Sequence, residues 1–443
     1  MDNRDEPLLG VSLSDEQCPR AGGTLRAESS PGLKRWMVSR LLEFCGNPPI
    51  EIILWNGDRI APRGGGPAVA RVRIHDRSAF WRLVVDPELY FGDAYAARQI
   101  EVEGSLVEFL IAVYYGLERA GARGVLRTAG SWLHRPRSTS VRRARDNIHA
   151  HYDIGNEFYR LWLDQELVYT CAYFPSPDAT LEEAQQAKMH HVCRKLRLRE
   201  GEFVVEAGCG WGSLALFMAR NYGVRVRAYN ISHQQITCAQ ERARREGLAD
   251  RVEFIEDDYR NIAGEYDVFV SVGMLEHVGT RFYPALGAVI DRSLKPQGRG
   301  LVHSIGRIRP APMNAWIERR IFPGAYPPSL AEMMPIFEPF GLAILDVENL
   351  RLHYARTLEH WLERFERSAD AVCNMFDENF VRTWRLYLAG SIAAFVTGEL
   401  QLFQVLFNRA QSNEVPWTRT HLYAGAATQA PASGMRLRAA GGE

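Results

Sequence analysis

The segment Glu206–Leu214, which reads EAGCGWGSL, carries the strongest chemical signal in the sequence. Its glycines Gly208, Gly210 and Gly212 can adopt positive φ and let the backbone approach a ligand with no Cβ in between. The segment follows the strand-like run 203–205 and opens a helical stretch, so it predicts a glycine turn at a strand-to-helix junction. Such a turn is a common place for a nucleotide-like cofactor, although a plain tight turn would use the same residues.

Polar residues near the next predicted strand narrow the choice of ligand. A strand over 224–230 ends in Asn230 and is followed by Ser232 and Gln235, with no Asp or Glu to hold a ribose. The sequence also contains no G-x-x-x-x-G-K-[ST] loop. Both a nicotinamide cofactor and a nucleoside triphosphate are therefore disfavoured.

Three further side chains could do chemistry. Glu276 lies beside His277 after an apolar run, and His303 lies within another one. Taken alone, a Glu-His pair is more often a surface or capping pair, and a histidine on an apolar strand is more often a core residue. Cys171 invites a nucleophilic interpretation, but a free cysteine is commonly just buried.

The elements that must position these residues alternate between strands and helices. Further strands are predicted over 252–255, 267–272, 300–304 and 343–347, with a helix over 282–294. This alternation indicates an α/β fold with a doubly wound sheet. The residues Thr180-Leu-Glu-Glu183 fit a capping box at the start of the helix that precedes the first strand.

Several motifs in this frame resemble the cyclopropane-fatty-acyl-phospholipid synthases, which are S-adenosylmethionine-dependent and similar to the mycolic acid methyltransferases. They are EAGCGWGSLA, YNISHQQ, DDYR, SVGMLEHVG and LVHSIG, in that order. The resemblance continues through Asn147–Phe174, Ile321–Leu330 and His353–Trp361. It implies a Rossmann-like class I methyltransferase domain. The segment Phe91–Leu106 resembles the N-terminal domain of the long phospholipid synthases, which the shorter mycolic enzymes lack.

The resemblance implies that a methylene group passes from S-adenosylmethionine to the double bond of an unsaturated phospholipid acyl chain, forming a cyclopropane. The alkene would attack the sulfonium methyl, and bound bicarbonate would deprotonate the resulting carbocation. The matching catalytic and anion-pocket positions are Cys171, Glu276, His303, Ile305 and Tyr354. In this assignment His303 and Tyr354 donate hydrogen bonds to the anion, Ile305 contributes backbone, and Glu276 accepts the O–H of the bicarbonate.

Cofactor contacts are implied in the same way, with the adenine near Tyr259. The matching positions are Tyr169, Thr170, Gly208, Cys209, Gly210, Ser232, Gln235 and Tyr259. An acyl pocket should be apolar and aromatic, although an aromatic stripe fits an ordinary core equally well. Its candidates are Phe174, Tyr283, Tyr326, Trp361 and Phe395.

Other products and other classes stay open. Thr170, Leu275 and Asn261 depart from the serine, phenylalanine and aspartate of the family pattern and could alter the fate of the cation. A C-methyltransferase that makes methyl- or methylene-branched acyl chains is therefore the main alternative. A lipid-binding protein that keeps the fold without turnover is another. A small-molecule N- or O-methyltransferase would not need the anion-pocket residues.

Length and composition agree with a large enzyme. The chain has 443 residues, which suggests two or three domains, and 46% of them are hydrophobic. The seven cysteines form no C-x-x-C pair, so a reducing cytosol is expected. The apolar residues of 389–407 fall at helical spacing and predict a buried or amphipathic helix, so no transmembrane span is expected. No metal site is predicted, because further ligands are lacking around His149, His151, His190 and His191.

Charge is unevenly distributed, although the net charge is zero. Eight arginines and no carboxylate lie between Glu118 and Asp146. A solvated linker would explain this run, and so would attraction to anionic lipid headgroups, worth about 1 kcal/mol per basic residue near the surface. Nucleic acid is not expected, because aromatic interleaving is missing. We expect a cytoplasmic, peripherally membrane-associated protein that meets unsaturated phospholipid acyl chains at the membrane surface, and a homodimer stays open.

The chain divides into five predicted segments. They are a disordered tail (1–30), a smaller α+β accessory domain (31–133), a basic linker (134–146), the methyltransferase domain (147–425) and a second disordered tail (426–443). Within the accessory domain, Asn56-Gly57 predicts a hairpin over 51–60. A strand near 69–74 and a helix near 106–117 are expected to follow it.

Overall fold

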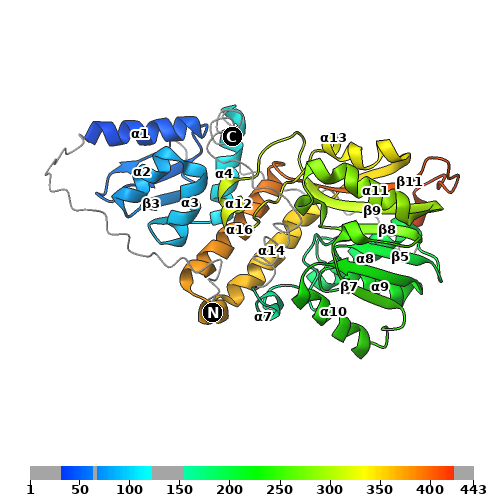
Figure 1. Ribbon diagram of the computed structural model, residues 1–443. Coiled ribbons are helices and arrows are strands. Elements are labelled where there is room, and N and C mark those ends of the chain that lie inside the picture. The colour runs from blue at the N-terminus through cyan, green and yellow to red at the C-terminus, as the bar shows by residue number, and fades with distance from the viewer. Residues whose placement is uncertain (1–30, 63–66, 122–153, 424–443) are drawn as a thin grey trace, which may run out of the picture.

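The computed structural model describes residues 31–62, 67–121 and 154–423. The two predicted tails and the predicted basic linker lie outside the described residues. Figure 1 shows a smaller N-terminal unit beside a larger unit built on a twisted sheet. No helix in the described part of the chain is long and apolar enough to cross a membrane.

The accessory domain is a four-stranded sheet in the order β2-β1-β3-β4, with helices packed on it. Its strands are β1 (Ile50–Ile53), β2 (Arg59–Ile60), β3 (Ala70–Ile74) and β4 (Ile100–Glu103). Its helices are α1 (Pro31–Phe44), α2 (Arg77–Val85), α3 (Pro87–Ala96) and α4 (Leu106–Arg119). The hairpin predicted at Asn56-Gly57 is confirmed, because β1 and β2 pair antiparallel with Ile52 opposite Ile60.

The larger domain is built on a seven-stranded sheet in the order β10-β11-β9-β8-β5-β6-β7. The five strands from β9 to β7 are parallel, and β11 runs antiparallel between β9 and β10. The strands are β5 (Phe203–Ala207), β6 (Arg225–Asn230), β7 (Val252–Glu256), β8 (Tyr266–Val272), β9 (Leu294–Gly306), β10 (Leu342–Asn349) and β11 (Gln401–Arg409). This confirms the α/β doubly wound prediction.

Helices cover both faces of this sheet, as Figure 1 shows for α9 and α11. The helices are α7 (Asn156–Arg160), α8 (Leu181–Leu196), α9 (Ser213–Tyr222), α10 (His233–Arg245), α11 (Tyr283–Ser293), α12 (Ala315–Arg320), α13 (Leu330–Met333), α14 (Arg351–Arg367), α15 (Ala369–Met375), α16 (Glu378–Val396) and α17 (Thr420–Tyr423). Successive strand residues alternate between the two cores: Val204 packs with α8 and α9, and Val205 packs with α11. The predicted capping box of α8 is present, since the Glu183 amide donates to Thr180 and the Thr180 amide donates to Glu183.

The prediction of one helix over 389–407 is wrong in its second half. Helix α16 ends at Val396, the chain turns at Gly398 with φ +81°, and β11 begins at Gln401. The side chains of 401–408 are buried on both faces of the sheet, so the apolar run does not alternate. A fully buried strand and a buried helix give the same continuous apolar pattern.

Candidate functional site

The glycine turn lies at the carboxyl end of β5, and its backbone is packed too closely for side chains at Gly208 and Gly212. Gly208 has φ +84°, and a Cβ on it would lie 2.8 Å from Cβ of Met274. A Cβ on Gly212 would lie 2.5 Å from the Phe254 ring. Gly210 also has positive φ, +53°, but a Cβ there would meet no atom within 4 Å. Gly210 therefore borders open space, as the wall of a ligand site would.

The next two strands end beside this turn and present polar groups. Asn230 Nδ2 donates to the Gly210 carbonyl (3.3 Å) and to Gln235 Oε1 (2.7 Å). Ser232 caps α10 and accepts from the Gln235 amide (3.4 Å). Among the described residues, Gln235 Nε2 is buried and has no hydrogen-bond partner. Tyr259 is buried after β7, so the predicted cofactor residues share one edge of the sheet.

Hydrogen bonds from α8 hold the segment that contains Tyr169 and Thr170. Gln185 Nε2 donates to the Thr170 carbonyl (2.9 Å), and Lys188 Nζ donates to Thr170 Oγ1 (3.1 Å). The Tyr169 hydroxyl lies 2.9 Å from that of Tyr387 on α16. A Cβ on Gly273, just after β8, would lie 3.0 Å from Thr170 Cγ2. The segment therefore lies against the carboxyl end of β8, beside the glycine turn.

Two ionisable residues of this region were missed by the sequence reasoning. Burial lowers the pKa of Lys188 to about 8 and raises the pKa of Glu206, at the end of β5, to about 8. Within the described chain, Glu206 Oε2 has no hydrogen-bond partner. The helical spacing of the apolar residues in α8 could have indicated that Lys188 is buried. The lysine stands on the buried stripe of Leu181, Ala184 and Val192.

Glu276 is the most distinctive of the predicted catalytic residues. It sits on a short 3-10 turn, Leu275–His277, after β8 and is only 6% exposed. Its Oε1 accepts a 2.6 Å hydrogen bond from the Ile305 amide, while Oε2 is buried and unpartnered among the described residues. Burial raises the pKa of Glu276 to about 7, although the Ile305 amide and the Ser304 hydroxyl favour the charged form. The Tyr283 hydroxyl is likewise buried without a partner in the described part.

His303 and Cys171 are both held in their neutral forms. His303 Nδ1 lies 3.0 Å from Gln404 Nε2 of β11, and burial lowers the pKa of His303 to about 3. The Cys171 thiol donates to the Ala172 carbonyl (3.1 Å), and burial raises its pKa well above the ordinary value. A thiol kept in this form is a poor nucleophile.

Tyr354 connects these residues to the aromatic core. Its ring centroid lies 4.6 Å from Phe395 and 6.0 Å from Trp361. Cys171 and Tyr354 belong to one buried cluster, and Ile305 packs against that cluster. Because Ile305 also binds Glu276, the structure brings four of the five predicted catalytic residues into one region. His303, two residues before Ile305, shares its face of β9.

The acyl-pocket candidates divide into four places. Trp361 and Phe395 pack around Tyr354, whereas Tyr326 lies at Glu276, whose carbonyl accepts from the Tyr326 amide (2.8 Å). Tyr283 lies in the core of the α11 face. Phe174 instead stacks on His360 with a centroid distance of 5.4 Å.

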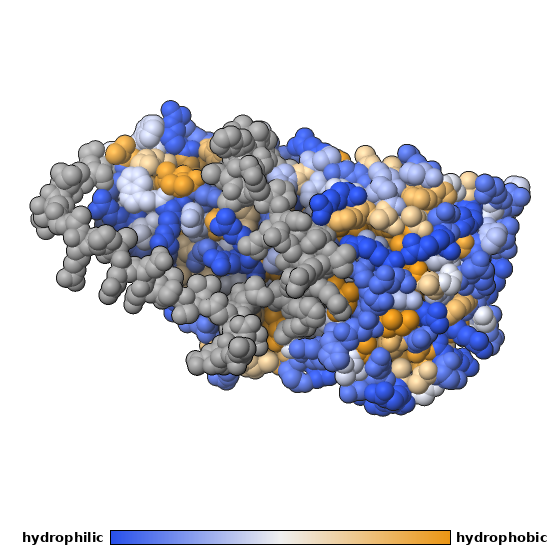
Figure 2. Space-filling view, viewed as in Figure 1, coloured by the Kyte–Doolittle hydropathy of each residue, from blue (hydrophilic) through white to orange (hydrophobic). Residues whose placement is uncertain are grey.

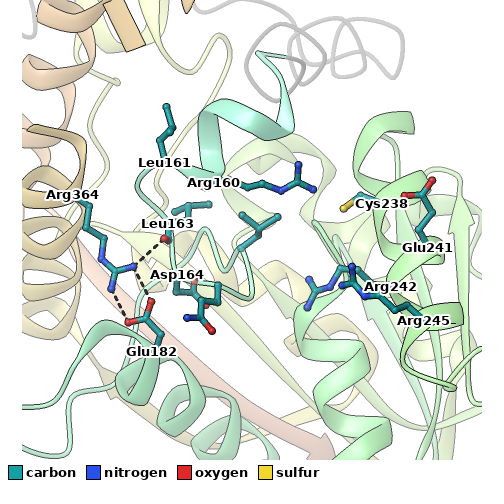
Figure 3. Close-up of a pocket in the computed structure, with 12 residues that line it drawn as sticks. Arg160, Leu161, Leu163, Asp164, Glu182, Cys238, Glu241, Arg242, Arg245 and Arg364 are labelled. Atoms are coloured by element: carbon teal, nitrogen blue, oxygen red, sulfur yellow. Dashed lines mark hydrogen bonds and ion pairs between the residues drawn. The ribbon is translucent and has the colours of Figure 1, made fainter. Parts of the chain in front are cut away.

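A cavity of about 560 Å³ lies elsewhere, between α7, α10 and α14 (Figure 3). None of the predicted catalytic or cofactor residues lines it. Its charges are largely compensated: Arg364 forms two bonds to Glu182, of 2.8 and 2.6 Å, and Arg242 pairs with Glu166. In the described part of the chain, no cluster of three or more His, Cys, Asp or Glu side chains could hold a metal ion.

Comparisons with known proteins show the family of the chain. The chain matches the family described as "Mycolic acid cyclopropane synthetase" over residues 139–405, and residues 37–120 match a domain of unknown function. It is 35% identical to a probable fatty acid methyltransferase of Pseudomonas putida over 85% of this chain and 96% of that protein. It is 37% identical to the cyclopropane-fatty-acyl-phospholipid synthase of Escherichia coli K12 over 79% of this chain and 90% of that one.

Solved structures show the same relationship. The mycolic acid cyclopropane synthase CmaA1, in complex with SAH and CTAB, is 28% identical with a TM-score of 0.58. It matches 60% of this chain and 98% of that one. The chain therefore belongs to the mycolic acid cyclopropane synthetase family, and it is an enzyme of the cyclopropane-fatty-acyl-phospholipid synthase type with a class I methyltransferase fold.

Proposed function

We propose that this enzyme transfers a methylene group from S-adenosylmethionine to the double bond of unsaturated phospholipid acyl chains and forms cyclopropane fatty acids. The observation that carries the proposal is the buried carboxylate Glu276, whose Oε2 has no partner in the described chain. Its hydrogen-bond partner Ile305 packs against the aromatic cluster, and Met274, two residues before Glu276, lies against Gly208 of the glycine turn. The similarity to the E. coli synthase supports the same substrate class.

The residues at the carboxyl ends of β5, β6 and β7 fit S-adenosylmethionine. Gly210 leaves room for a ligand, and Gln235 Nε2, which has no partner among the described residues, can donate to it. When bound, the cofactor supplies an electrophilic methyl group. The chain contributes orientation and exclusion of water, since Tyr169 is packed among Trp162 and Trp361 at centroid distances of 5.3 Å. Aromatic faces also stabilise positive charge that develops on the alkene.

We assign a bound bicarbonate to the residues around Glu276, where it would supply a weak base. Glu276 Oε2 can accept the O–H of the anion, and the Tyr283 hydroxyl, unpartnered among the described residues, can donate to it. His303 is neutral, so it places no positive charge beside the anion. The Ile305 amide already binds Glu276, so we assign Ile305 to holding the carboxylate rather than to donating its amide to the anion.

We assign the site of action to the membrane surface, and the accessory domain carries a fitting surface. Trp36 on α1 is 56% exposed, and Trp81 and Val85 on α2 are 38% and 77% exposed. Figure 2 shows exposed apolar residues over this part of the accessory domain. Helix α1 also carries Lys34, Arg35 and Arg40 against the single acid Glu43. Apolar and basic side chains together match an anionic phospholipid surface.

Isotope labelling tests the reaction. Purified enzyme is incubated with unsaturated phospholipid vesicles, bicarbonate and S-adenosylmethionine carrying a CD3 group, and the acyl chains are analysed by mass spectrometry. Cyclopropane formation retains two deuterons and removes the double bond. Retention of three deuterons in a branched chain would establish methyl branching instead. Cofactor binding without label in the lipid would overturn the proposal in favour of another substrate or a lipid-binding role.

A further inference from the structure

Helix α3 of the accessory domain makes several hydrogen bonds to the short helix α12 of the catalytic domain. Asp93 on α3 accepts hydrogen bonds from Arg320 Nε (3.0 Å) and Nη2 (2.9 Å), and from Trp316 Nε1 (3.2 Å). A Cβ on Gly92 would lie 2.3 Å from Trp316 Nε1, so only glycine lets the backbone of α3 lie against the indole. The Ala315 amide at the start of α12 also donates to Glu88 (3.1 Å). Helix α12 is thus held by α3 along its whole length.

The chain that leaves α12 runs directly to the proposed catalytic carboxylate. Phe322 packs edge-on to Tyr387, with ring centroids 5.4 Å apart, and lies 6.2 Å from the ring of His277. The Tyr326 amide then donates to the carbonyl of Glu276 (2.8 Å). Segment 321–329 therefore connects α12 to the turn that carries Glu276.

We propose that Asp93 is a positioning residue of the reaction: by fixing Trp316 and Arg320, it holds segment 321–329 against the turn of Glu276. The accessory domain thereby sets the geometry of a carboxylate that it does not touch. The role of Glu276 in turnover rests on the proposed function. The mechanical link from Asp93 to Tyr326 does not rest on it.

Removal of Asp93 should loosen α12 without separating the domains. The side chains of Asp93 and Arg320 are 28% and 37% exposed, so their pairing contributes more to geometry than to stability. Other contacts hold the two domains together independently. Arg382 of α16 donates to the Tyr95 carbonyl (2.7 Å) and the Ile100 carbonyl (3.2 Å).

The test compares Asp93→Asn with two matched acid-to-amide variants. Glu103→Gln removes a carboxylate that pairs with Arg73 inside the accessory domain. Glu378→Gln removes one that pairs with Arg98 at the same domain interface but away from α12. For each variant, kcat and the KM for S-adenosylmethionine are measured on vesicles, and hydrogen–deuterium exchange is followed in peptides that cover 317–335.

We expect Asp93→Asn to lower kcat about tenfold, because a misplaced catalytic group costs rate, while the KM for S-adenosylmethionine changes less than about twofold. Exchange should rise in the 317–335 peptides and stay unchanged in β5 and β6. Trp316→Phe, which keeps an aromatic side chain but removes the indole N–H and part of the ring that packs on Gly92, should act in the same direction. Glu103→Gln and Glu378→Gln should leave both readouts unchanged.

The proposal is overturned if Asp93→Asn leaves the exchange of 317–335 unchanged, or if Glu378→Gln lowers kcat as much. The second result would assign the effect to the interface as a whole. If the wild-type enzyme does not act on phospholipid chains, the proposed function fails. The exchange measurement still decides whether Asp93 holds the segment.

Discussion

At the scale of single residues, four of the buried polar atoms that the described chain leaves unpartnered belong to residues of the site region. Glu276 Oε2 and the Tyr283 hydroxyl border the proposed anion pocket, while Gln235 Nε2 and Glu206 Oε2 border the proposed cofactor site. A buried polar atom without a partner costs about 1–3 kcal/mol. A fold that keeps several of them in one region gives up stability there, which is expected where ligands supply the missing partners.

Glu276→Gln tests the carboxylate by its chemistry. The amide can still accept the Ile305 hydrogen bond through its oxygen, but it cannot accept a hydrogen bond through the other atom. We expect kcat to fall by about 100-fold or more, in the range of a lost acid–base group. Affinity for S-adenosylhomocysteine, measured by calorimetry, should change less than about twofold, because the predicted cofactor residues lie on other loops. Near-normal turnover would remove Glu276 from the site.

The same substitution makes a prediction about stability. Burial raises the pKa of Glu276 from 4.5 to about 7, so the native state binds more protons than the unfolded state between these pH values. The contribution of Glu276 to the free energy of unfolding of the wild type therefore falls as pH rises through this window. The glutamine of Glu276→Gln does not titrate, so the variant does not lose this stability as pH rises. Denaturant titrations should show the variant gaining on the wild type by on the order of 3 kcal/mol between pH 4.5 and pH 8. A difference that is constant with pH would contradict the shifted pKa.

At the scale of elements, local sequence signals were sufficient wherever local physics decides. The strand–helix alternation, the capping box at Thr180 and the hairpin at Asn56-Gly57 are confirmed, since each depends on neighbouring residues. Which residues are buried depends on tertiary packing, so local sequence signals could not predict it. The sequence of β11 predicts a helix because both faces of the strand are buried and its apolar residues do not alternate. The sequence gives Lys188 no special role, because a lysine on a helix normally faces solvent, whereas this one is buried.

The glycine turn allows a matched test of cofactor binding. Gly210 and Gly247 have φ of +53° and +66°, and a Cβ on either would meet no atom within 4 Å. Alanine should thus cost each site about 1 kcal/mol of stability, from backbone strain alone. Only Gly210→Ala should place its methyl group where the cofactor approaches. We expect it to weaken S-adenosylmethionine binding at least about tenfold by calorimetry, with Gly247→Ala unchanged. Equal affinities would move the cofactor away from Gly210.

At the scale of the whole molecule, the two domains meet through α3 and α4 packed on α16, which Figure 1 shows next to α14. The polar contacts of this interface join residues far apart in sequence. Asp93 and Trp316, for example, are separated by 223 positions. The residues next to each partner in the sequence contain no signal for the contact. The sequence predicts a smaller accessory domain, but it contains no local signal for the way in which that unit contacts the catalytic domain.

The membrane-facing surface proposed on the accessory domain predicts where the enzyme should meet lipid. If α1 and α2 rest on the membrane, burial of each exposed tryptophan contributes about 1 kcal/mol or more, which corresponds to a change in partition of about fivefold. Trp36→Ala and Trp81→Ala should each weaken sedimentation with anionic unsaturated vesicles by that factor. The binding should also weaken with added salt, because Lys34, Arg35 and Arg40 lie on α1.

Trp417 provides the matched control for this measurement. It is more exposed than either tryptophan of the accessory domain, at 102%, and lies in the C-terminal part of the catalytic domain. Trp417→Ala should leave vesicle binding unchanged if insertion is confined to α1 and α2. Equal losses in all three variants would show that any exposed tryptophan contributes. Unchanged binding of Trp36→Ala and Trp81→Ala would place the lipid-facing surface elsewhere, because an inserted indole cannot be removed without reducing the apolar area buried in the bilayer.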